Sequence, residues 1–356
     1  MTVQPIASLG PIASPDEAVA RETARLLDEK TKPPGSLALL ESLACRLAAI
    51  RGAVPTGPLT PAIVVAAGDH GVAEEGVSAY PQAVTGQMLA NFASGGAAVS
   101  VLARQAGARL IVVDAGVLDP PSVDGIRSAV VDGVRGTANL AAGPAMSREV
   151  AVGLIERGIA LARELAGDGI QLIALGDMGI GNTTAGSALC AALLPGDPAA
   201  VCGPGTGLDP AGVERKIDVV RRALSANGLG TDGAVRDPIG VLAAVGGLEI
   251  AFLVGVMLGA AERRVPIVLD GFITGAAALV ASVLEPAASG CMIAATRSPE
   301  PGHGLVLDRL GLQPLLDLSL RLGEGSGAAL ALPLLRSAVA ILTEMATFEE
   351  AGVSRG

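Results

Sequence analysis

Aromatic residues are nearly absent from this 356-residue chain, which has no Trp, one Tyr and four Phe. Half of its residues are hydrophobic and 48 are glycine, so its core must be filled mainly by Ala, Val, Leu and Ile. Such a composition favours closely packed parallel strands and helices over an aromatic-rich sandwich of sheets.

Histidine and cysteine are scarce as well. Two histidines are too few for a His-based metal cluster, and the four cysteines are scattered without a CxxC pair. The sequence therefore predicts neither a zinc site nor a disulfide framework, but buried thiols in a reducing compartment. No strand end carries the paired acidic residues of metal-dependent pyrophosphate chemistry, so we expect a reaction that needs no metal and no cofactor.

Charge and hydropathy exclude further classes of protein. The net charge is −10 and no basic run occurs, which argues against a nucleic-acid partner. Residues 1–11 contain no Lys or Arg, so we expect no signal peptide and a cytoplasmic location. Residues 239–261 are apolar enough to imitate a membrane span, but Glu249 interrupts them after Gly246 and Gly247. A lone carboxylate is costly in lipid, and a buried core helix without a membrane span is predicted instead.

Short apolar runs recur along the chain with helical segments between them. They occupy residues 63–67, 110–113, 172–175, 265–269, 291–294 and, more weakly, 316–320. Continuous apolar strands that alternate with helices are typical of a parallel sheet covered on both faces. We predict an α/β fold, with a large Rossmann-like, doubly wound and mostly parallel domain over residues 56–330.

The two ends of the chain follow a different pattern. Residues 16–29 and 37–50 have the spacing of amphipathic helices, and the Pro-rich loop 32–36 separates them. The chain becomes helical again after Ser326. We therefore predict that residues 1–55 plus 331–356 form a small helical domain beside the sheet.

Acidic residues follow the predicted strands, most of them next to glycine. They are Asp69, Asp114, Asp177, Asp270 and Glu324. Ligands of open parallel sheets bind outside the carboxyl ends of the strands, so we expect these five carboxylates to line one crevice and to supply negative charge and a base. An Asp at such a place can equally cap the helix that follows. Glu324, which has a glycine on each side, fits that alternative least.

Two glycine-rich loops are candidates for holding a phosphate. Residues 179–184 lead from a strand into a helix, where N–H groups and hydroxyls converge near the positive helix end. Residues 203–207 precede Arg215 and Lys216. Neither loop has the Gly–Lys–Ser/Thr of a P-loop and neither is a GxGxxG, so neither identifies a phosphate site by itself.

Seven co-linear segments between residues 30 and 350 resemble the nicotinate-nucleotide:dimethylbenzimidazole phosphoribosyltransferase family. They are KPPGSL at 32–37, AGDHGV at 67–72 with Pro81 and Val84–Thr85, GIGNTT at 179–184, GPGTG at 203–207, DGF at 270–272, EPGH at 300–303 and RLGEG at 321–325. The resemblance implies a glycosyltransferase of cobalamin nucleotide-loop assembly. Such an enzyme transfers the phosphoribosyl group of nicotinate mononucleotide to 5,6-dimethylbenzimidazole or a related base, giving α-ribazole 5′-phosphate and nicotinate. The resemblance also implies a Rossmann-like fold with a small helical domain, and a homodimer whose active site is completed by the partner.

The same resemblance implies roles for individual residues. Glu324 matches the general base, which accepts the imidazole proton of the attacking base. Asp177 stands where the family usually has Glu, a residue that assists near the base, and Thr296 stands where His is common. The implied substrate-binding positions fall into a phosphate group and an aromatic-base group. The phosphate group comprises Gly179, Gly181, Asn182, Thr183, Gly205, Thr206, Lys216 and Ser298, and the base group comprises Tyr80, Met88 and Leu322.

Two other functions remain open. In a nicotinate-mononucleotide nucleosidase of the same fold, water would replace the base as acceptor. A non-catalytic nucleotide-binding regulatory protein would share the binding loops, but it would have no need of a carboxylate at Glu324.

Overall fold

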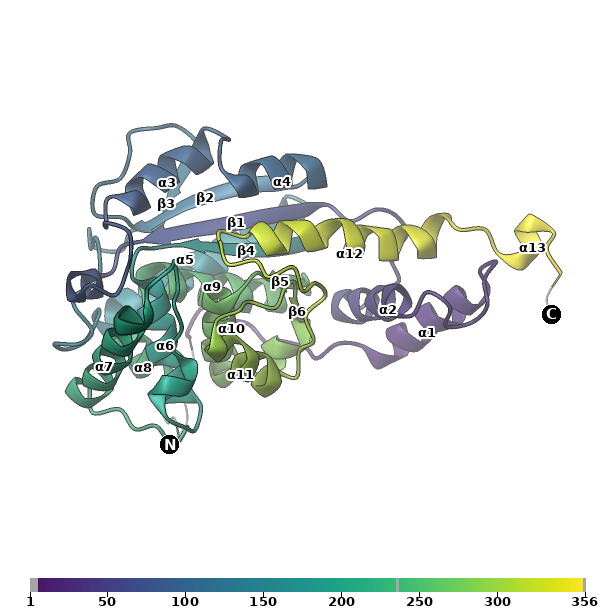
Figure 1. Ribbon diagram of the computed structural model, residues 1–356. Coiled ribbons are helices and arrows are strands. Elements are labelled where there is room, and N and C mark those ends of the chain that lie inside the picture. Colours follow the sequence, from purple (N-terminus) through teal and green to yellow (C-terminus); the bar gives the residue numbers. More distant parts are fainter. Residues whose placement is uncertain (1–5, 235–236, 355–356) are drawn as a thin grey trace.

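The structure is a computed structural model that describes residues 6–234 and 237–354. At its centre lies a six-stranded sheet with the order β3-β2-β1-β4-β5-β6, in which every pair of neighbours is parallel (Figure 1). The strands are β1 (Pro61–Gly68), β2 (Arg109–Gly116), β3 (Ile126–Ser128), β4 (Leu172–Met178), β5 (Ile267–Leu269) and β6 (Met292–Ala294). This order reverses direction between β1 and β4, as in doubly wound folds. The predicted Rossmann-like α/β class is confirmed.

Both faces of the sheet are covered, which explains why β1 is buried along its whole length. Ile63 and Val65 belong to one hydrophobic core, while Val64 and Ala66 belong to the other, because successive side chains of a strand point to opposite faces. The first core is closed by α3 (Val84–Ala93), α4 (Ala98–Ala106) and α12 (Ser326–Glu344). The second is closed by α5 (Arg148–Gly167), α6 (Asn182–Leu193), α7 (Pro210–Ala226), α8 (Pro238–Val245), α9 (Leu248–Glu262), α10 (Phe272–Leu284) and α11 (Pro301–Leu310).

The terminal helices lie beyond one end of the sheet (Figure 1). Helix α1 (Glu17–Asp28) packs on α2 (Leu39–Arg51), α2 packs on α12, and the short α13 (Phe348–Ala351) ends the described chain. The boundary that we predict at residue 330 falls inside α12, which contacts α2 as well as α4 and β4. The division into two domains therefore stays a prediction.

Two strand predictions differ from the structure. Residues 316–320 form no strand: Leu316 makes a single bridge to Thr296, and Leu318 is exposed. The sheet instead gains β3, whose three residues pair with β2 at the opposite edge. An edge strand of this length has too few buried apolar residues to be recognised by its pattern.

The apolar stretch 239–261 forms two helices rather than the one that we predicted. Gly246 and Gly247 separate α8 from α9, and both helices are buried in the core. Among the described helices, α12 is long and apolar enough to cross a membrane, but 56% of its apolar window is buried inside the protein. Core helices pass that test too, so the absence of a membrane span stays a prediction.

Candidate active site

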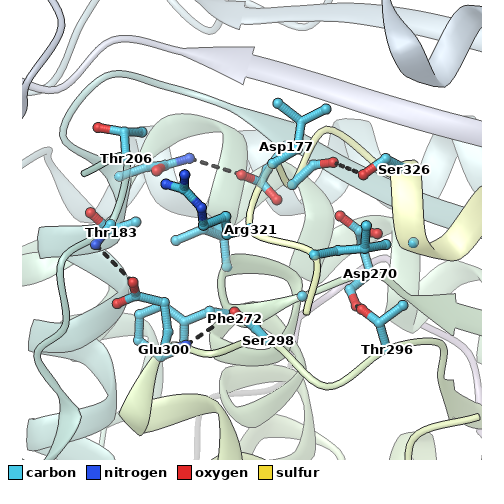
Figure 2. Close-up of a pocket in the computed structure, with 18 residues that line it drawn as sticks. Asp177, Thr183, Thr206, Asp270, Phe272, Thr296, Ser298, Glu300, Arg321 and Ser326 are labelled. Carbon is cyan, nitrogen blue, oxygen red and sulfur yellow. Dashed lines mark hydrogen bonds between the residues drawn. The ribbon is translucent and has the colours of Figure 1, made fainter. Parts of the chain in front are cut away.

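A pocket that is partly open to solvent lies outside the carboxyl ends of β4 and β5 (Figure 2). Five segments that are distant in sequence meet there: the end of β4 with the start of α6, the loop before α7, the loop after β5, the loop after β6, and the turn before α12. Its lining residues are Asp177, Asn182, Thr183, Gly205, Thr206, Asp270, Gly271, Phe272, Ile273, Thr296, Ser298, Glu300, Leu320, Arg321, Leu322, Gly323, Ser326 and Gly327. The doubly wound topology places ligands at this edge of the sheet.

The turn that carries Glu324 has an unusual backbone. Gly323, Glu324 and Gly325 all have positive φ, with values of 77°, 62° and 82°. For Glu324 this left-handed conformation is strained, and such strain is typical of functional sites. The Asp270 carboxyl holds the turn in place, because it accepts the N–H groups of Gly325 at 3.1 Å and Ala328 at 2.8 Å. The strained glutamate is therefore fastened to the end of β5.

The carboxyls of this region are buried and repel one another. Burial, and then Asp270, raises the pKa of Glu324 to about 7. Burial raises the pKa of Asp270 itself to about 6, against the hydrogen bonds that it accepts. The pKa of Asp177 is raised well above its ordinary value by burial, Asp270, Glu249 and Glu324, while the hydrogen bond from Asn182 at 2.9 Å opposes the rise. A base whose pKa lies near neutrality is well matched to proton abstraction at neutral pH.

We expected all five strand-end carboxylates in one crevice, but only Asp177 and Asp270 line this pocket. Glu324 is not among the lining residues, although Gly323 and Ser326 of the same turn are. Asp114 accepts the N–H groups of Gly116 and Val117 and binds Arg135 at 2.9 Å. Asp69 accepts the N–H of Leu118 and lines a separate pocket. Both residues bind backbone N–H groups at the end of β2 and in the loop after it, so they stabilise a turn and do not cap a helix, which was the alternative that we considered. The expectation of a single five-carboxylate crevice is wrong.

The two glycine-rich loops meet at Lys216. Its ammonium group is fully buried and donates to Thr183 Oγ1 at 3.0 Å and to the Gly203 carbonyl at 2.9 Å. Burial lowers the pKa of Lys216, while Glu300 opposes this effect. Lys216 thus links the two glycine-rich loops from the protein interior. It does not line the pocket, whereas Thr183 and Gly205 do.

The pocket wall includes residues to which the sequence gave no role. Glu300 accepts the Gly205 N–H at 2.7 Å, while its Oε2 is buried without a hydrogen-bond partner. Figure 2 shows Arg321 and Phe272 directed into the same space. Glu300 lies in a segment that carried the family resemblance, and this was the signal available for it. Phe272 and Arg321 also lie in such segments, but nothing in the sequence pattern indicated where their side chains point.

The structure brings together only part of the predicted set. Seven predicted residues line the pocket: Asp177, Asn182, Thr183, Gly205, Thr206, Ser298 and Leu322. Gly179 and Gly181 lie behind it against His70. Tyr80, before α3, and Met88, within it, are not among the lining residues. No group of three or more His, Cys, Asp or Glu in the described ranges could hold a metal ion.

Comparisons with known proteins agree over nearly the whole chain. A family model described as a phosphoribosyltransferase matches residues 12–353. The nicotinate-nucleotide–dimethylbenzimidazole phosphoribosyltransferase of Chloroflexus aggregans is 52% identical over 99% of this chain and 98% of its own, and that of Desulforamulus reducens is 49% identical over 98% of each. The crystal structure of the Thermus thermophilus enzyme of the same name covers 96% of this chain and 100% of its own, at 47% identity and a TM-score of 0.86.

Proposed function

Because the chain belongs to the family of nicotinate-nucleotide–dimethylbenzimidazole phosphoribosyltransferases, we propose that it transfers the phosphoribosyl group of nicotinate mononucleotide to 5,6-dimethylbenzimidazole. The products are α-ribazole 5′-phosphate and nicotinate. One observation carries the proposal: the Glu324 carboxyl is buried in a strained turn beside Asp270, and its pKa is raised to about 7. A protein that only binds nucleotides gains nothing from a base held in this way.

The chemistry requires one proton acceptor. A benzimidazole nitrogen attacks ribose C1′ while the bond from C1′ to the pyridinium nitrogen breaks, and the electron pair of that bond neutralises the nicotinate ring. The other benzimidazole nitrogen must lose its proton, which passes to Glu324. Attack on the face opposite the leaving group converts the β-nucleotide into an α-riboside. Asp177 adds negative charge near the positive charge that develops on base and ribose.

We assign the phosphate to the side of the pocket formed by the turn before α6 and the loop before α7. The turn before α6 presents the start of a helix, which favours an anion. Thr183 and Gly205 line the pocket on this side, and Ser298 lines it from the loop after β6. Lys216 supplies positive charge from behind the two glycine-rich loops. The ribose then lies between the phosphate wall and Glu324, with its C1′ directed toward the acidic side.

The test is incubation of the purified protein with nicotinate mononucleotide and dimethylbenzimidazole, followed by mass spectrometry. We expect a base-dependent α-ribazole 5′-phosphate product. Release of nicotinate from the mononucleotide alone would identify a nucleosidase instead, and binding without turnover of either kind would identify a regulatory protein. A competition mixture of benzimidazoles, purines and phenols would show which base is preferred.

Lys216→Ala should raise KM for nicotinate mononucleotide by about tenfold or more, the usual cost of losing a charged hydrogen-bond donor. KM for the benzimidazole should change much less, because the ammonium lies between the phosphate loops. The matched control is Arg215→Ala, which removes the neighbouring but exposed cation that donates to the Gly76 carbonyl. An equal rise in both Michaelis constants would place the phosphate elsewhere.

The pH dependence of kcat/KM should have an acidic limb near neutrality. The Glu324 pKa is about 7 and only the carboxylate can accept a proton, so kcat/KM should fall as pH falls through that value. Initial rates from about pH 5 to about pH 9 would check this. A limb near the ordinary Glu pKa would mean that the environment of Glu324 does not control the reaction.

The free energy of unfolding should fall as pH rises over the same range, whereas kcat/KM should rise. The folded-state pKa values of Glu324 and Asp270, about 7 and about 6, lie above their ordinary values. Between those ordinary values and neutrality the folded protein therefore binds more protons than the unfolded chain. The contribution of these two groups to the free energy of unfolding is therefore complete at low pH and is lost as pH rises toward 7. Ionising the base for catalysis thus costs folding free energy.

We also propose that the enzyme is a homodimer and works in the cytoplasm without a metal or cofactor. The family resemblance supports the dimer, and Leu39 and Leu318 are exposed leucines available for contact with a second copy. All four cysteines are free, which suits a reducing compartment. Light scattering on the purified protein would measure the mass of the assembly.

A further inference from the structure

Arg321 is the one cationic side chain that lines the pocket in the described part of the chain. Lys216 contacts the two glycine-rich loops from the protein interior, but it does not line the pocket. Arg321 is exposed, and Figure 2 shows its side chain directed into the pocket. A guanidinium stays protonated in proteins and offers five N–H donors in a planar fork. The pocket therefore holds one cation that a ligand can reach.

No protein group neutralises this cation. Among the described residues Arg321 makes no hydrogen bond and no ion pair, although Asp177, Asp270 and Glu300 line the same pocket. Each of those carboxyls already accepts at least one hydrogen bond from another residue. The donors of Arg321 are therefore free for an anionic group that enters with a ligand.

Nicotinate mononucleotide carries two anionic groups, the 5′-phosphate and the carboxylate of the nicotinate ring. The proposed phosphate site already has a cation, because Lys216 lies behind its two loops. The carboxylate must instead approach C1′, in a region that contains Asp177, Asp270 and Glu324. Like charges at short range repel one another. Such a region would bind an uncharged nicotinamide ring better than nicotinate, unless a cation faced the carboxylate.

The position of Arg321 in the chain suits it to supply that cation. It lies three residues before Glu324, in the segment that leads into α12. Asp270 holds this segment by accepting the Gly325 N–H. The guanidinium and the base therefore belong to one anchored segment, whereas the residues assigned to the phosphate belong to others. Both groups act near C1′, the atom to which the nicotinate ring is attached.

We propose that Arg321 binds the nicotinate carboxylate and selects the acid form of the mononucleotide over the amide form. The two parallel N–H groups of a guanidinium match the two oxygens of a carboxylate. The amide of nicotinamide mononucleotide has one oxygen and no negative charge, so it cannot form this pair. The inference rests on the proposed transfer reaction, whose leaving group it specifies. Arg321 determines specificity and takes no part in the proton transfer.

Initial rates with dimethylbenzimidazole as acceptor give kcat/KM for the acid and the amide mononucleotide. The wild-type protein should prefer the acid by about tenfold to about a hundredfold, the scale of a charge-assisted hydrogen-bond pair. Arg321→Met should lower kcat/KM for the acid by that factor and leave the value for the amide nearly unchanged. Arg321→Lys keeps the charge but loses the planar fork, so it should retain part of the preference.

The matched control is Arg309→Met, which removes the same charge from the last turn of α11. Arg309 is exposed, lies outside the pocket and likewise has no polar partner among the described residues. Its substitution should leave both values of kcat/KM unchanged. Since Arg321 makes no polar contact within the described chain, Arg321→Met should unfold at the temperature of the wild type.

A third compound, nicotinate riboside, separates the two anions because it lacks the phosphate. Calorimetry on the resting protein measures Kd for all three compounds without turnover. Arg321→Met should weaken binding of the riboside and of the acid mononucleotide by the same factor. Equal weakening of the two mononucleotides with no effect on the riboside would place Arg321 at the phosphate and overturn the proposal.

The two proposals can fail separately. Equal Kd values for acid and amide in the wild type, or an unchanged preference in a folded Arg321→Met protein, would overturn the role of Arg321 even in an active transferase. A wild-type protein that makes no α-ribazole phosphate would instead refute the proposed function. A preference in Kd that Arg321→Met removes would still support carboxylate recognition in that case.

Discussion

Glu324→Gln lowers kcat by about a hundredfold or more, the usual scale for removal of a positioned general base. The amide is nearly isosteric with the carboxyl but cannot accept the benzimidazole proton. Single-turnover rates would measure the chemical step directly. Binding of nicotinate mononucleotide should persist, because the residues assigned to the phosphate belong to other segments than the turn that carries Glu324.

The matched control for this substitution is Glu344→Gln, which changes an exposed carboxylate at the far end of α12. It should leave kcat unchanged. The folded Glu324→Gln protein should also be at least as stable as the wild type at neutral pH, because the charge that is costly to bury has been removed. A Glu324→Gln enzyme with the turnover of the wild type would refute the assignment of the base.

The architecture of the sheet could be predicted because its main strands are long, apolar and buried on both faces. Residues 63–67, 110–113 and 172–175 all lie within strands, since a continuous aliphatic run between turn residues has few alternatives. The strand predicted at residues 316–320 was wrong because Leu318 is exposed, Leu316 and Leu320 are only partly buried, and only Leu316 forms a bridge at the sheet edge. The local sequence pattern of a segment indicates whether it tends to be buried. Whether the segment pairs into the sheet depends on contacts that are distant in sequence.

The candidate site could likewise be predicted where it depends on local sequence pattern, but not where it depends on contacts between distant segments. The position of Asp177 followed from a strand end and a neighbouring glycine. Glu324 was indicated only by its two flanking glycines, because the strand predicted before it does not form. The partners of those carboxyls did not, because Asp270 reaches Gly325 and Ala328 across more than fifty residues of sequence. The pairing of Glu249 with His70 spans 179 residues, and it depends on a helix break that composition alone did not reveal. Sequence pattern indicated which edge of the sheet is functional, and tertiary contacts decided which carboxyls belong to it.

Gly176→Ala should reduce kcat about as strongly as loss of the base, although residue 176 never meets a substrate in the proposed mechanism. Gly176 is buried in β4. A Cβ at this position would lie 2.5 Å from the Gly325 nitrogen, 2.6 Å from the Glu324 carbonyl carbon and 2.7 Å from the Glu324 carbonyl oxygen. All three atoms belong to the backbone, so no side chain can rotate away. Since β4 is held at Gly176 by its pairing with Val65 of β1, the turn must move rather than the strand.

Displacement of that turn moves the Glu324 carboxyl away from the substrate. It also strains the hydrogen bonds that the Gly325 and Ala328 N–H groups donate to Asp270. A misplacement of about 1 Å can cost about a hundredfold in rate, while overpacking typically costs about 1–3 kcal/mol of stability. We therefore expect kcat to fall about a hundredfold in a protein that still folds, measured by turnover and thermal unfolding together. Gly167→Ala at the end of α5 is the control, since no atom lies within 4 Å of the added Cβ. A folded Gly176→Ala protein with normal kcat would show that the reaction does not need the position of this turn, and the strained conformation of Glu324 would then have no catalytic role.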